Sequence, residues 1–259
     1  MENSSGVKTF FEYLPESIKF HKLKKEGLAR FIFVLVLFCQ LIGKYALYKY
    51  SQMFPVEEIE KIYNNLASFS STSSADIYQP SIHILYAFLV ALGVSLLSKL
   101  VSNLFLSVYM YSYLSEQRGK DSGFRASFSG VFRHMGRIIA YNVIFGLLVL
   151  FGSMFFVIPG IIAYVMFVFG FCYVLDLKLT MADAMTASSE ITKGKKARIA
   201  GVLVAYFVIF KLPVFLLVGN SIAGVFIGAF LTTITNLILQ RFIIKIYMDL
   251  EYKVEVTHR

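Results

Sequence analysis

The chain has 259 residues, of which 57% are hydrophobic and only 16% are charged, and its formal net charge is +9. A soluble domain of this length needs far more polar surface, so the composition excludes an ordinary soluble protein and predicts a polytopic membrane protein. The basic residues lie in short segments beside apolar runs. This arrangement predicts contacts with anionic lipid headgroups rather than with nucleic acid.

Residues 1–27 are predicted to form a cytoplasmic amphipathic segment, because lysines alternate there with aromatic and aliphatic residues. The first membrane span follows at residues 28–47. The next stretch, residues 49–80, is net acidic and has helical spacing of apolar residues after Pro55, which predicts a short amphipathic helix. The second span is assigned to residues 82–108. The helix has no strong breaker before Ser115, so we expect it to project beyond the bilayer.

Residues 116–137 are basic and place Phe124, Phe128, Phe132 and Met135 on one helical face, which predicts a second interfacial helix. An apolar run from Ile138 to Leu179 comes next. At 1.5 Å per residue it makes about 63 Å of helix, twice the hydrocarbon thickness of about 30 Å.

Pro159 and Gly160 lie near the middle of this run. Pro lacks the N–H of an inner helical turn and Gly allows a tight reversal, so the pair predicts a turn between spans at residues 138–158 and 160–179. A weaker amphipathic segment follows from Met181 to Ile191. The last spans are assigned to residues 198–218 and 222–246, which completes a membrane domain at residues 28–250. Residues 251–259 form a polar cytoplasmic tail.

Lysine and arginine concentrate on one side of this arrangement, and the opposite side holds the acidic loop and two nearly uncharged turns. The asymmetry predicts that both termini are cytoplasmic. The predicted fold is an all-α integral membrane protein with six transmembrane helices in three hairpins and cytoplasmic amphipathic interfacial helices. Seven basic residues are predicted to contact anionic lipid: Arg125, Arg133, Arg137, Lys193, Lys195, Lys196 and Arg198.

The second half of the chain also carries a family pattern. It comprises Val157-Ile158-Pro159-Gly160-Ile161-Ile162-Ala163, Tyr173-Val174-Leu175-Asp176, Ala184, Ser188 or Ser189, and Thr192-Lys193-Gly194-Lys195-Lys196. Over residues 123–200 this string resembles a family of six-helix bacterial membrane proteins that includes YciC and the membrane domain fused to some glycerophosphodiester phosphodiesterases. The resemblance implies a multi-pass protein of the bacterial plasma membrane. It implies no catalytic residues in this domain.

The residues themselves predict no enzyme. No two carboxylates lie within the spans, the four histidines are scattered, and Cys39 and Cys172 are separate in apolar stretches. We therefore expect no cofactor and no metal. Asp176, near the end of the fourth span, is expected to pair with a basic neighbour such as Lys178 or Arg198.

Polar residues inside the spans define a candidate polar cavity. Lys211 lies past the midplane of the fifth span, and Pro213 leaves a helical carbonyl without its donor, so the two favour either a site for an anionic group or a lysine that reaches the outer headgroups. Polar stripes on the second and sixth spans favour either a shared cavity or interhelical hydrogen bonds. The candidates are Lys99, Ser102, Asn103, Lys211, Thr232, Asn236 and Gln240.

Two functions remain open at this point. The first is a non-catalytic membrane protein that acts through contacts with anionic lipids, a membrane-protein partner or a second copy of itself, as a scaffold, accessory or immunity-type factor. The second is a transporter or channel for a lipid-like or anionic small solute. The basic interfacial segments favour the first function, and Lys211 with Pro213 favours the second.

Overall fold

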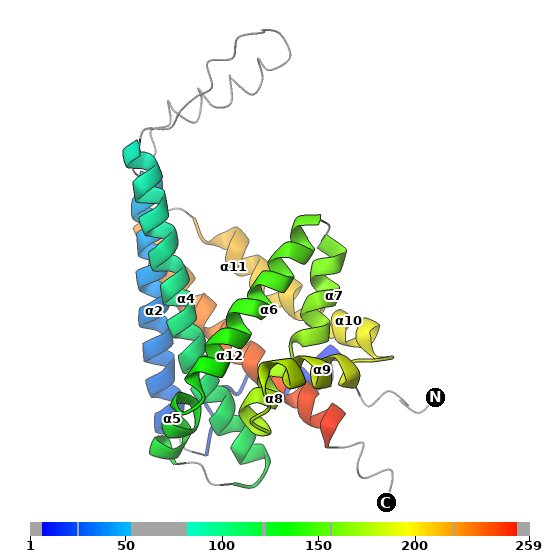
Figure 1. The fold of residues 1–259 in the computed structure, drawn as a ribbon. Helices are drawn as coiled ribbons and strands as arrows, with labels where there is room; N and C mark the ends of the chain where they lie inside the picture. Colours follow the sequence, from blue (N-terminus) through cyan, green and yellow to red (C-terminus); the bar gives the residue numbers. More distant parts are fainter. Residues whose placement is uncertain are drawn as a thin grey trace, which may run out of the picture.

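The computed structural model describes residues 7–24, 26–52, 82–120, 123–155, 157–219 and 221–252, and within these ranges it is helical without strands (Figure 1). The helices are α1 (Phe10–Ser17), α2 (Glu26–Gln52), α4 (Ile82–Gln117), α5 (Phe124–Phe132), α6 (Met135–Phe155), α7 (Val157–Phe167), α8 (Gly170–Asp176), α9 (Met181–Ile191), α10 (Lys196–Tyr206), the π-helix η1 (Phe207–Lys211), α11 (Leu212–Leu217) and α12 (Ile222–Glu251). The helix predicted after Pro55 lies outside the described residues.

Six segments of the described chain are long and apolar enough to cross a membrane, which agrees with the predicted number of spans. They are Glu26–Gln52, Leu89–Gln117, Met135–Met154, Ile158–Asp176, Lys196–Leu216 and Ile222–Glu251. Large apolar side chains on these segments remain exposed, as lipid-facing residues must: Phe38, Leu97, Phe151 and Phe215 are examples. The protein is therefore embedded in a membrane through several passes.

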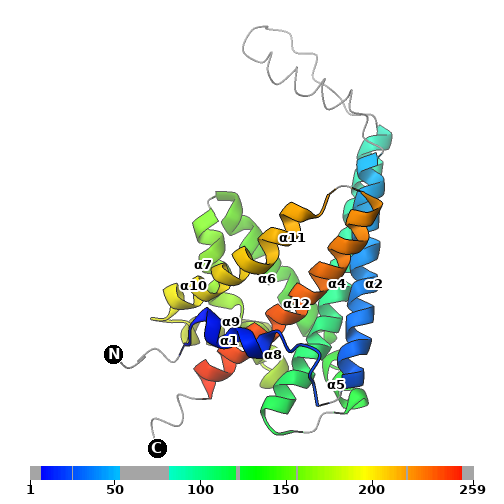
Figure 2. The ribbon, with the colours of Figure 1, turned by 180° about the vertical axis from the view of Figure 1, so that it is seen from behind.

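Three long helices form the frame of the bundle. α2 lies along α4, and α12 packs against both of them (Figures 1 and 2). α4 continues to Gln117, as the absence of a breaker predicted. The two halves of α12 differ, because Phe226 and Phe230 are exposed whereas most residues from Leu237 to Leu250 are buried. One end of the bundle thus has a protein core around α12, and the other half is open to lipid.

The turn predicted at Pro159–Gly160 lies a few residues earlier. α6 ends at Phe155 and α7 begins at Val157, so both residues belong to the first turn of α7, where a proline loses no hydrogen bond. Gly160 serves the contact between the two helices instead. A Cβ on Gly160 would lie 2.2 Å from Ser153 Oγ of α6, so only glycine permits this close approach.

The predicted fourth span, residues 160–179, is not one helix. It breaks after Phe167, and α8 starts at Gly170 in a new direction (Figure 1). Tyr141 of α6 enters the break and donates a hydrogen bond to the carbonyl of Phe167. A Cβ on Gly170 would lie 2.0 Å from the Tyr141 hydroxyl. The break therefore depends on a side chain from another helix, which local sequence does not reveal.

The predicted fifth span is irregular as well. It consists of α10, a π-helical turn from Phe207 to Lys211, and α11, in which Pro213 lies in the first turn. The N–H of Leu212 donates to the carbonyl of Phe207, five residues back. Pro213 has no N–H to continue the regular ladder, and π-turns of this kind are frequent at functional sites. This irregularity ends at Lys211.

α1, α5, α9 and the last turns of α12 lie at one end of the molecule, which we call the basic end (Figures 1 and 2). α5 packs on the start of α2 through the rings of Phe124 and Phe128, whose centroids lie 5.4 and 6.2 Å from that of Phe31. α1 packs on α12, where the ring of Phe10 stacks on Phe242 at 5.3 Å. Phe10 and Tyr13 are thus covered by protein, while Phe11 and Ile18 are exposed.

Candidate functional site

Lys211 turns toward the inside of the bundle. Its Nζ donates to Oδ1 of Asn236 at 2.5 Å, and the side chain is half-buried. Asn236 lies at the midpoint of α12, so the ammonium group does not extend to the outer headgroups. Of the two roles that the sequence left open for Lys211, this geometry favours a polar site inside the span.

Lys44 and Lys99 are the basic side chains near Lys211. Lys44 comes from α2 and Lys99 from α4. These helices are in contact at this level, because a Cβ on Gly43 would lie 3.2 Å from that of Ser98. Lys44 Nζ lies 3.4 Å from the position of a Cβ on Gly228 of α12. Lys44 and Lys211 therefore both approach α12, at Gly228 and at Asn236, and Lys99 lies on the helix that packs beside α2.

One stripe of α12 faces this group. Gly228, Thr232 and Asn236 follow one another at intervals of four residues, so they share a face of the helix. Gln240 continues the stripe and is half-buried, as is Thr232. The sequence prediction contained the stripe but not Lys44. A lysine three residues before the end of a predicted span is a signal that would have justified including it.

The polar residues of α4 have another role. Ser102 accepts a hydrogen bond from Gln40 of α2 at 3.2 Å, and Asn103 donates to Asn142 of α6 at 3.0 Å. Ser102 is buried. These contacts match the alternative in which polar side chains join helices, each contributing about 0.6–2 kcal/mol. The structure does not bring Ser102 and Asn103 into contact with Lys211.

The predicted lipid-contact residues lie at the basic end. Arg125, Arg133, Arg137 and Lys193 are exposed, whereas Lys195, Lys196 and Arg198 are half-buried. Arg137 also donates to the carbonyl of Lys178 at 2.9 Å, which holds the connection between α8 and α9. The remaining exposed side chains leave a basic surface over α5 and the α9–α10 connection.

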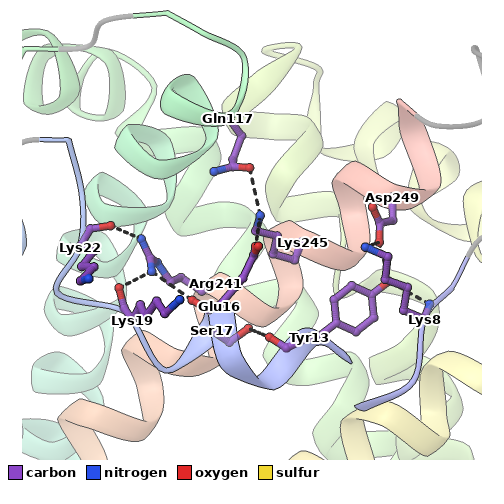
Figure 3. Close-up of polar contacts among 10 residues, drawn as sticks. All are labelled: Lys8, Tyr13, Glu16, Ser17, Lys19, Lys22, Gln117, Arg241, Lys245 and Asp249. Atoms are coloured by element: carbon purple, nitrogen blue, oxygen red, sulfur yellow. Dashed lines mark hydrogen bonds and ion pairs between the residues drawn. The ribbon is translucent and has the colours of Figure 1, made fainter. Parts of the chain in front are cut away.

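A second group of basic residues lies on the last turns of α12, and sequence reasoning missed its role. Arg241 is buried and donates to the carbonyls of Glu16, Lys19 and Lys22 in the N-terminal segment, residues 7–24 (Figure 3). Its guanidinium lies 4.3 Å from the ring centre of Tyr113. Every hydrogen-bonded carbonyl here is contributed by the N-terminal segment, so Arg241 ties that segment to the last span.

Lys245 and Asp249 extend this contact along the same face of α12 (Figure 3). Lys245 pairs with Glu16 and donates to Gln117 at 3.2 Å. The Lys245 ammonium holds the pKa of Glu16 below its usual value. Asp249 accepts from Tyr13 at 3.0 Å, and burial raises the pKa of Tyr13. The spacing 241, 245, 249 within an apolar span is the sequence signal that could have indicated this contact.

Asp176 has the role expected of it but a different partner. Its carboxylate pairs with Arg118, beyond the end of α4, at 2.9 Å and accepts from the hydroxyls of Tyr247 and Tyr252 at 3.1 and 2.6 Å. The expected pairing with Lys178 or Arg198 overlooked Arg118, which is distant in sequence. Asp176 is surrounded by donors, so it stabilises the meeting of α4, α8 and α12.

Two residues of the family pattern at residues 157–196 have structural roles. Ser188 of α9 is buried and donates to the carbonyl of Met166 at 2.7 Å, beside the break between α7 and α8. Gly194 adopts a φ of +76°, which favours glycine.

In the part of the chain that the structure describes, no three His, Cys, Asp or Glu side chains group as a metal site requires. Comparisons with protein-family models, curated proteins and solved structures gave no match.

Proposed function

We propose that the protein is a non-catalytic, multi-pass protein of the bacterial plasma membrane that acts through contacts with anionic lipids or a membrane-protein partner. In this proposal the six spans form three hairpins, both termini are cytoplasmic, and the basic end faces the cytoplasm. It is a scaffold, accessory or immunity-type factor of the family that the pattern at residues 157–196 resembles.

One observation carries the proposal. Arg125 and Arg133, on α5 and its C-cap, and Lys193, directly after α9, have exposed side chains, and α5 and α9 lie at the same end of the bundle. Each lysine or arginine near an anionic surface contributes about 1 kcal/mol of attraction. Helices that present several such residues beside exposed phenylalanines, as Phe124 and Phe132 are, suit an anionic headgroup layer.

Charge reversal tests the proposal. The variant Lys193→Glu, Lys195→Glu, Lys196→Glu should retain less phosphatidylglycerol in native mass spectrometry, because attraction becomes repulsion at three positions. Lys49→Glu, an exposed lysine in the last turn of α2 away from the basic end, is the matched control and should leave lipid retention unchanged. Unchanged retention in the triple variant would contradict a lipid-binding basic end.

A second candidate function is a transporter or channel for an anionic or lipid-like solute. The observation that favours it is the inward orientation of Lys211 toward Asn236, at the midpoint of α12. A cation held within a span is expensive in hydrocarbon and is characteristic of pathways for charged solutes.

A further inference from the structure

Among the described residues, Lys44, Lys99 and Lys211 have no acidic partner in an ion pair. The Asn236 amide oxygen, which accepts from Lys211, is neutral. Up to three positive charges thus share one region of a membrane-spanning bundle.

Such an arrangement is costly without an anion. A single lysine at the centre of a transmembrane helix costs about 2.5–3.5 kcal/mol on insertion scales, and neighbouring like charges add repulsion. Lys99 increases the cost because its side chain is exposed within the candidate span Leu89–Gln117, where protein does not shield its charge. An anion that reaches all three lysines would remove most of the cost.

We propose that Lys44, Lys99, Lys211 and Asn236 form an intramembrane binding site for a phosphate group. Lysine binds phosphate as a compact point charge with several donors, and three of them match an anion with several acceptor oxygens. The amide nitrogen of Asn236 supplies a further donor while its oxygen holds Lys211. The π-turn that ends at Lys211 places irregular backbone beside the site.

The surroundings favour a phosphate carried by a lipid. Phe207 on η1 and Phe226 on α12 are each 58% exposed, and Phe230 is 47% exposed. These rings belong to the segments that carry Lys211 and Asn236, so acyl chains can lie against them while the headgroup meets the lysines. Free inorganic phosphate is the other source of the same chemistry. The site depends on neither proposed function, because a scaffold or a transporter can hold a lipid there.

The test uses the full chain in detergent with phosphatidylglycerol, and in a separate arm with inorganic phosphate, followed by native mass spectrometry. Lys211→Leu should lose a tightly held adduct or weaken it about tenfold, since one charge-assisted contact disappears. Lys49→Leu is the matched control, because Lys49 lies on α2 with Lys44 but is exposed and contacts the ring of Tyr45 at 5.8 Å. It should retain the adduct.

Asn236→Asp is the sharper variant. It places a carboxylate beside Lys211, which supplies an internal counter-ion and competes with phosphate. We expect this variant to unfold at a higher temperature than the wild type while losing the adduct. If Asn236 were purely structural, the Asn236→Asp variant would unfold at a higher temperature but would keep the adduct. This variant remains informative even where Lys211→Leu fails to fold.

The outcomes separate the alternatives. Loss of a phosphatidylglycerol adduct in both variants supports a lipid site, and loss of an inorganic phosphate adduct supports a site for the free ion. Wild-type adducts in both variants, or the absence of any adduct in the wild type, would overturn the proposal. Reversal of Lys193, Lys195 and Lys196 should leave the adduct that depends on Lys211 intact, so failure of the basic-end function remains distinguishable.

Discussion

α12 organises two groups of basic side chains, and they differ in how their charge is met. Arg241 and Lys245 lie in its buried half and are matched by three carbonyls and by Glu16. Lys211 meets the middle of the helix through one neutral amide, with Lys44 and Lys99 nearby. A buried cation with several acceptors or an acidic partner fixes the fold, whereas a cation with one neutral acceptor has donors left for a ligand. From this contrast we expect Arg241 and Lys245 to stabilise the fold and Lys211, with its neighbours, to bind a ligand.

The largest expected effect is on Arg241. Arg241→Leu should lower the free energy of unfolding by about 3–5 kcal/mol, because it leaves buried carbonyls without donors and detaches the N-terminal segment. Thermal unfolding in detergent measures the change. Arg30→Leu is the control, since Arg30 is exposed and pairs with Glu26 at 3.0 Å, and exposed pairs contribute about 0–1 kcal/mol. Equal effects of the two variants would contradict the stabilising role of Arg241.

Lys211→Leu should change stability much less. It removes one hydrogen bond, worth about 1 kcal/mol, but also an unmatched charge whose burial opposes folding. We expect an unfolding free energy within about 1 kcal/mol of the wild type, or above it, in detergent without anionic lipid. A loss as large as that of Arg241→Leu would show that Lys211 is structural and would end the distinction between the two groups.

The smallest expected effect is a pH dependence at the edge of the first group. Lys245 lowers the pKa of Glu16, so the pair stabilises the folded state above the usual carboxyl pKa, and this contribution is lost as the pH falls through the lowered value. Glu16 is largely exposed, so the effect is small. Limited proteolysis of the N-terminal segment should increase in wild type at acidic pH. Glu16→Gln should show less change with pH, and an identical pH profile would contradict a role for the pair.

The spans could be predicted from sequence because they depend on local properties. A run of apolar residues long enough to cross a bilayer identifies a span whatever surrounds it, and six such segments occur among the described residues. The breaks could not be predicted in the same way. The end of α7 depends on Tyr141 reaching the carbonyl of Phe167 and on the missing side chain of Gly170, and these meet only in the folded bundle.

The candidate site was partly accessible from sequence for the same reason. Lys211, Lys99 and Asn236 are visible as polar residues within apolar spans, and Lys211 and Asn236 do meet. Their grouping with Lys44 depends on which helices are neighbours, which one sequence does not specify. Arg241 was overlooked because its partners are backbone carbonyls, and carbonyls carry no residue-type signal.

The contact of Arg241 with residues 16–22 also sets the order in which the molecule can be completed. The N-terminal segment is the first part of the described chain to leave the ribosome, and α12 is the last. The Arg241 guanidinium, which donates to the carbonyls of this segment, is available only after the sixth span has been made and inserted. Its docking on α12 therefore marks the end of assembly, and a chain truncated before Arg241 would leave residues 16–22 without the donor that binds their carbonyls.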